Sequence, residues 1–151
     1  MMDFSEEQLN TLTLGVFNPG EIYRLKLTGK EGVKPKNQGD NGRNKYFVVL
    51  GTTDDGELIG FVLINSDINQ YLPNEVKALH YQITVKDYPF LKKDSYICCS
   101  ELKHIESTHF FERFQDKAVA VLSDKHLEVV KNLLAQSPGV SAAAMQNFGL
   151  L

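Results

Sequence analysis

Basic side chains are concentrated in one stretch of this sequence. Residues 24–45 carry seven basic and two acidic side chains, whereas the whole chain of 151 residues has a formal net charge of −3. A local cluster of cations on an otherwise acidic protein is typical of a site for an anionic ligand such as a phosphate backbone. The same composition also fits an ordinary solvated loop. The seven basic residues are Arg24, Lys26, Lys30, Lys34, Lys36, Arg43 and Lys45.

A hydroxyl side chain is expected beside the end of this basic stretch. Arg43 and Lys45 are two residues apart, so on a strand they share one face. The apolar runs at 45–50 and 58–64, joined by an Asp-Asp-Gly turn, predict an antiparallel hairpin. Such a hairpin brings Lys45 next to Ser66, and a cation beside a hydroxyl can bind phosphate. Alternatively, Lys45 is a solvated strand end and Ser66 caps the following turn.

Several common enzyme motifs are absent from the sequence. There is no P-loop, no G-x-G-x-x-G and no H-E-x-x-H, and the four histidines are scattered singly. We therefore expect neither a metal ion nor a cofactor. Cys98 and Cys99 are neighbours in a predicted strand, where adjacent side chains point to opposite faces. We expect two unpaired thiols and a reducing compartment.

The elements that must position these residues are mostly strands. Short runs with alternating or continuous apolar residues recur along the chain, separated by Gly, Pro and Asp turn signals. One connection is rich in Gly and Lys and has almost no apolar side chains, so we expect it to be flexible. The predicted elements are a helical segment at 5–14, strands between 20 and 105, the flexible loop at 28–44, and a helix at 123–136 with Ser123 as its N-cap.

A single domain is predicted for residues 1–151. Strands followed by a terminal helix indicate a mainly β protein of the α+β class, built on a small antiparallel barrel of about five strands. No apolar run approaches the roughly 18 residues that span a bilayer. The acidic first ten residues lack the apolar core of a secretory signal. We therefore expect a cytoplasmic protein without a membrane partner.

The order of several segments carries a resemblance. These segments are Gly20-Glu21-Ile22-Tyr23 before a strand, the Gly- and Lys-rich loop, the buried strand 45–50, Ile64-Asn65-Ser66, and residues 100–105 before the terminal helix. The order resembles that of the PemK/MazF family of toxin-type RNA endonucleases, over about residues 19–134. The resemblance implies the small SH3-like antiparallel barrel of that family and metal-independent cleavage of single-stranded RNA, in which a 2′-hydroxyl attacks the adjacent phosphate.

The resemblance also implies roles for particular residues. Family members place an arginine at the start of the buried strand, where this chain has Lys45, with Arg43 two residues before it. They place a threonine at the end of the next strand, where this chain has Asn65 or Ser66. Lysine supplies charge without the planar fork of arginine, and serine supplies a hydroxyl. The implied catalytic residues are Arg43, Lys45 and Ser66, and the implied RNA-binding residues are Lys30, Lys34, Lys36 and Asn65.

Two partners follow from the resemblance, namely single-stranded RNA and an antitoxin protein that neutralises the enzyme. It further implies a homodimer with the RNA groove at its interface. The departures from the family pattern at Lys45 and at Asn65 or Ser66 support an alternative. On that alternative the chain is a catalytically silent small β-barrel that binds a protein or a nucleic acid.

Overall fold

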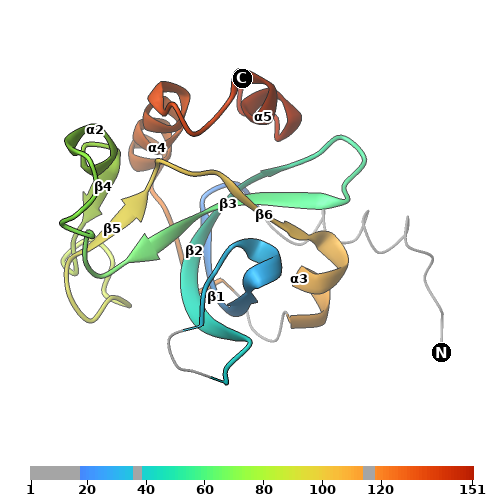
Figure 1. Cartoon of the computed structure of the whole chain (residues 1–151), viewed down its shortest axis with the longest axis horizontal. Helices are drawn as coiled ribbons and strands as arrows, with labels where there is room; N and C mark the ends of the chain where they lie inside the picture. Colours follow the sequence, from blue (N-terminus) through green and yellow to red (C-terminus); the bar gives the residue numbers. More distant parts are fainter. Residues whose placement is uncertain (1–17, 36–38, 114–117) are drawn as a thin grey trace.

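The computed structural model describes residues 18–35, 39–113 and 118–151. The helical segment predicted at 5–14 lies outside these residues, as does Lys36. Figure 1 shows an antiparallel sheet that curls into a half-barrel, accompanied by helices. The mixed sheet-and-helix architecture, with a helix near the C-terminus, agrees with the expected α+β class.

The sheet holds seven strands in the described part of the chain, in the order β4-β5-β3-β2-β1-β7, with β6 also paired to β3. Every pairing among them is antiparallel. The strands are β1 Glu21–Thr28, β2 Gly42–Thr52, β3 Leu58–Asn65, β4 His80–Ile83, β5 Ser95–Cys98, β6 Lys103–Glu106 and β7 Ala120–Val121. The helices are the 3-10 turn η1 Gly29–Glu31, α2 Asn74–Lys77, α3 Ser107–Arg113, α4 Asp124–Gln136 and α5 Ala142–Asn147.

The hairpin predicted from the two apolar runs is confirmed as β2 and β3. Phe47 lies opposite Leu63, and Val48 lies opposite Val62. The register shifts between Val49 and Gly51, which marks a bulge near the turn. This pairing fixes which side chains of β2 lie beside the end of β3.

The loop predicted at 28–44 is shorter than expected, because strands occupy both of its ends. β1 extends to Thr28, which pairs with Gly42 at the start of β2. A Cβ atom at Gly42 would lie 2.2 Å from the carbonyl oxygen of Leu27, so this glycine allows two strands to approach closely. The sequence pattern was misleading here because glycine serves both turns and close packing.

The first residues of this loop are also held in place. The backbone N–H of Thr28 donates to the Glu31 carboxylate at 2.9 Å, and the Thr28 hydroxyl accepts from the N–H of Lys30 at 3.3 Å. Glu31 and Val33 are both buried. Together these contacts form a capping box around η1 and direct the chain back against the sheet.

The strand expected across 95–105 is divided into two. β5 pairs with the end of β3, where Ile97 lies opposite Ile64, whereas β6 pairs with its start, where Ile105 lies opposite Ile59. The registers of the two pairings differ, and residues 99–102 bend to accommodate the difference. The strand count therefore exceeds the predicted five, and β7 adds a further edge strand beside β1.

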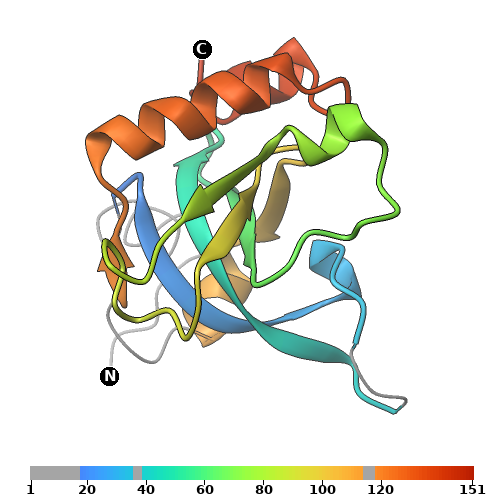
Figure 2. The same ribbon diagram turned by 90° about the vertical axis from the view of Figure 1, so that its left-hand side faces the viewer.

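Apolar side chains fill both sides of the sheet. Figures 1 and 2 show α4 and α5 on one side of the sheet and α3 on the other. The Ser123 hydroxyl accepts from the N–H of His126 at 3.2 Å, so α4 begins where its predicted N-cap stands. No helix in the described ranges combines the length and the apolar character needed to cross a membrane. On the first side α4 contributes Leu127, Val130 and Leu134, and on the second α3 contributes Phe110.

Candidate functional site

β2 changes from apolar to basic along one of its faces. Phe47 and Val49 are fully buried in the cluster that includes Phe110, and alternation places Lys45 and Arg43 on the same face. The polar end of β2 therefore continues beyond the apolar cluster. Lys45 is half-buried there, and its ammonium group donates a hydrogen bond to Oδ1 of Asn65.

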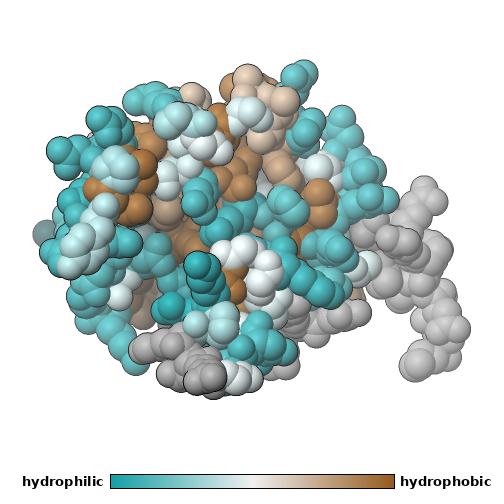
Figure 3. Space-filling view, in the orientation of Figure 1, coloured by the Kyte–Doolittle hydropathy of each residue, from teal (hydrophilic) through white to brown (hydrophobic). Residues whose placement is uncertain are grey.

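A groove of about 630 Å³ opens around Lys45, which we call the basic groove. It lies between the start of the 29–41 connection, the paired ends of β2 and β3, and the pair β4 and β5. In the orientation of Figure 1, this side of the molecule is mainly hydrophilic with small apolar patches (Figure 3). Five of the predicted site residues line the groove, namely Lys34, Arg43, Lys45, Asn65 and Ser66.

One other predicted RNA-binding residue does not line the basic groove. Lys30 lines a neighbouring hollow, which shares Glu101 and Lys103 with the basic groove. Lys36 falls outside the described residues. The 3-10 turn is the physical reason for the separation of Lys30 from Lys34, because it reverses the chain between them.

Two residues that the sequence reasoning missed also line the basic groove. His80 in β4 lies directly opposite Cys98 in β5, where cross-strand Cβ atoms are about 5 Å apart. Nδ1 of His80 is 3.0 Å from the carbonyl oxygen of Val76. A carbonyl only accepts, so Nδ1 carries the hydrogen and Nε2 is the proton acceptor. No local sequence pattern links positions 80 and 98, because only strand pairing brings them together.

The electrostatics of the groove favour an anion. Burial lowers the pKa of the Lys45 ammonium group, and the neighbouring charge of Arg43 lowers this pKa further. Within the described part of the chain, neither Lys45 nor Arg43 forms a salt bridge. The two acidic residues of the groove are already paired, Asp67 with Lys93 at 2.8 Å and Glu101 with Lys103 at 3.1 Å. An anion beside Lys45 would therefore stabilise its charged form.

These groups are suited to chemistry on a phosphodiester. Arginine and lysine bind phosphate oxygens, serine and asparagine donate hydrogen bonds, and histidine transfers protons near neutral pH. Among residues 18–35, 39–113 and 118–151, no group of three or more His, Cys, Asp or Glu side chains is placed to hold a metal ion.

No family model matches the chain, and no curated protein matches it either.

The two cysteines offer a test of this arrangement. Cys98 is half-buried and faces the basic groove, whereas Cys99 is fully buried on the other side of the sheet, where burial raises its thiol pKa to about 12. Because the thiolate is the nucleophile, N-ethylmaleimide at neutral pH should add once to the native protein, at Cys98. Intact mass and peptide mapping measure this. The Cys98→Ser variant should react only after unfolding in urea, and equal labelling of both native thiols would contradict the arrangement.

Proposed function

We propose that this protein binds single-stranded RNA in the basic groove and cleaves it without a metal ion, as a toxin-type endoribonuclease on a small barrel of the PemK/MazF kind. The observation that carries the proposal is the convergence of Arg43, Lys45 and Ser66, predicted from the sequence as catalytic, in one groove. On this proposal the protein acts in the cytoplasm as a homodimer, and an antitoxin protein neutralises it.

The binding step uses the cations of the groove. Arg43 is exposed, and its planar guanidinium can hold two phosphate oxygens at once. Lys45 is half-buried and oriented by Asn65, so it supplies a positioned point charge. Lys34 extends the positive surface along the same groove. The groove thus offers three cationic side chains to a phosphate.

The cleavage step requires three contributions from the protein. The 2′-hydroxyl must lose its proton, the non-bridging phosphate oxygens must be stabilised as their charge grows, and the 5′ oxygen must gain a proton as it leaves. We assign the first role to Nε2 of His80, the second to Lys45 and Arg43, and the third to a solvent water, which protonates the departing 5′ oxygen. The Ser66 hydroxyl donates a hydrogen bond to the phosphate. The products are a 2′,3′-cyclic phosphate and a 5′-hydroxyl.

Incubation with single-stranded RNA in EDTA tests both steps. We expect discrete fragments that end in a 2′,3′-cyclic phosphate. Binding to a 2′-O-methyl oligonucleotide, which lacks the attacking hydroxyl, should weaken with salt at a log–log slope of roughly −0.7 per phosphate contacted. Lys34→Ala should make that slope less steep without changing the fold.

The outcomes separate the proposal from its alternative. Salt-dependent binding with the RNA left intact would support the silent binding barrel and contradict the nuclease. A slope near zero would contradict RNA binding altogether and leave residues 24–45 as a solvated basic segment.

A further inference from the structure

A further hollow, of about 370 Å³, opens beside Tyr46, and we call it the Tyr46 pocket. Among the described residues that line it, five are cationic and none is acidic. One of the five, Lys93, is paired with Asp67 at 2.8 Å. The cationic lining residues are Arg24, Arg43, Lys45, Lys92 and Lys93.

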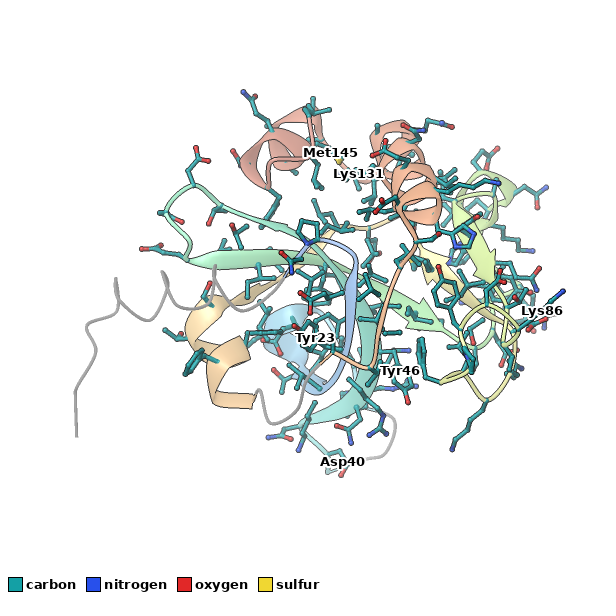
Figure 4. The ribbon with its side chains drawn as sticks, turned by 180° about the vertical axis from the view of Figure 1, so that it is seen from behind. Tyr23, Asp40, Tyr46, Lys86, Lys131 and Met145 are labelled. Carbon is teal, nitrogen blue, oxygen red and sulfur yellow. The ribbon has the colours of Figure 1, made fainter. Side chains whose placement is uncertain are left out.

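The sheet builds the floor of this pocket from one row of residues. Arg24 lies opposite Tyr46, and Tyr46 lies opposite Ile64, so the three side chains share a face across β1, β2 and β3. The connection between β4 and β5 supplies the wall, with Leu91 and Lys92. Figure 4 shows Tyr46 on β2 beside this connection, whereas Tyr23 points to the α3 side.

The ring of Tyr46 takes part in one aromatic contact and one cation–π contact. It is half-buried, and the Phe90 ring centroid lies 5.0 Å away at an interplanar angle of 55°. The guanidinium carbon of Arg24 lies 5.7 Å from the centroid of the Tyr46 ring. Arginine over an aromatic ring is a cation–π arrangement. The pocket therefore combines an aromatic surface with cations at its rim.

We infer that the Tyr46 pocket is a nucleotide subsite, in which a base stacks on the Tyr46 ring while its phosphate contacts Arg24 and Lys92. Proteins that bind single-stranded nucleic acids combine stacking aromatics with a positively charged path for the backbone. The volume is at the lower end of the range for small-molecule pockets, which suits a single nucleotide.

The Tyr46 pocket and the basic groove share part of their lining. Arg43, Lys45 and Ser66 line both hollows. A strand whose phosphate lies at Lys45 can therefore place a neighbouring nucleotide at Tyr46. The inference rests on the proposed function for the identity of the ligand, and it adds a residue that recognises a base.

Binding of a fluorescent 2′-O-methyl oligonucleotide, followed by anisotropy, tests the subsite without cleavage. Tyr46→Ala should weaken binding about tenfold or more, as loss of a stacking ring typically does. Tyr46→Phe keeps the ring and should bind as the parent does. Tyr71→Ala is the matched control, because Tyr71 is 87% exposed and lines neither hollow.

A set of oligonucleotides with one abasic site at each position in turn gives a second measurement, on the unmodified protein. An abasic site at one position should weaken binding to the parent protein about as much as Tyr46→Ala does. The Tyr46→Ala variant should bind that oligonucleotide as tightly as it binds the intact one. Parent-like binding by Tyr46→Ala, or equal tolerance of abasic sites everywhere, would overturn the subsite while RNA binding stands. Displacement of the oligonucleotide by an acidic peptide, with no effect of the base, would point to a protein partner. Absence of any oligonucleotide binding would overturn the proposed function and this inference together.

Discussion

Replacement of Lys45 by alanine is expected to lower the rate of RNA cleavage about 100-fold, as loss of a preorganised charge donor typically does. The Lys45 ammonium group is half-buried, is held by Asn65 and stands in a groove that also contains Arg43 and Ser66. Water that fills the space left by the side chain cannot supply a fixed positive charge at that position. Arg43→Ala should cause a loss of similar size, and Ser66→Ala a smaller one with most RNA binding retained.

Single-turnover rates with excess enzyme, measured in EDTA, give these effects directly. Lys131→Ala is the matched control, because Lys131 lies on α4 (Figure 4) beside Glu128 at 3.8 Å and lines neither hollow. It should cleave as the parent does. Full activity of the Arg43→Ala/Lys45→Ala double variant would remove the basic groove from the mechanism.

The same lysine predicts a dependence on pH. Burial and the Arg43 charge lower the pKa of Lys45 in the free protein, so the ammonium group loses its proton below the ordinary lysine value of 10.5. Phosphate binding requires the protonated form. RNA affinity should therefore be highest at lower pH and fall as pH rises through the lowered pKa. Lys45→Arg should remove this fall, because arginine stays protonated.

Other titrating groups of the groove must be controlled in this measurement. Cys98 faces the groove and raises the pKa of Lys45, against the effects of burial and Arg43, so the series is best measured in a Cys98→Ser background. A 2′-O-methyl oligonucleotide of adenine and cytosine avoids base ionisation and alkaline cleavage. If RNA affinity falls equally with rising pH in the parent protein and in Lys45→Arg, Lys45 does not cause the fall.

Replacement of Phe148 by alanine is expected to destabilise the fold by about 3 kcal/mol, as truncation of a buried phenylalanine typically does. Phe148 follows α5 and is only 8% exposed. Its ring packs on Gly60 of β3, where an added Cβ would lie 2.8 Å from the ring. The tail after α4 therefore stabilises the hairpin that carries Lys45.

Urea unfolding followed by circular dichroism measures this free energy. Leu151→Ala is the control, because Leu151 is 74% exposed and should contribute little. Gly60→Ala should also destabilise, and less so when Phe148 is already alanine, because the clash is then relieved. Unchanged stability of Phe148→Ala would show that the tail does not support the sheet in solution.

Some of this structure follows from local sequence alone. The β2–β3 hairpin could be predicted because apolar runs flank a turn signal, and its antiparallel geometry places Lys45 beside the end of β3. The opposite facing of Cys98 and Cys99 follows from strand alternation, and the start of α4 follows from the capping chemistry of Ser123. Each of these features lies within one continuous segment of the chain, so the local sequence pattern is enough to predict it.

The tertiary structure alone decided the rest of the candidate site. His80 meets Cys98 only through the pairing of β4 with β5, and the Tyr46 pocket requires the 84–94 connection to fold back over the β1–β2–β3 row. Glycines at 42, 51 and 60 are ambiguous in sequence, since the same residue type serves turns and close contacts. Pairings between distant strands depend on which apolar surfaces can be buried together, and that choice is made by the whole chain rather than by any local segment.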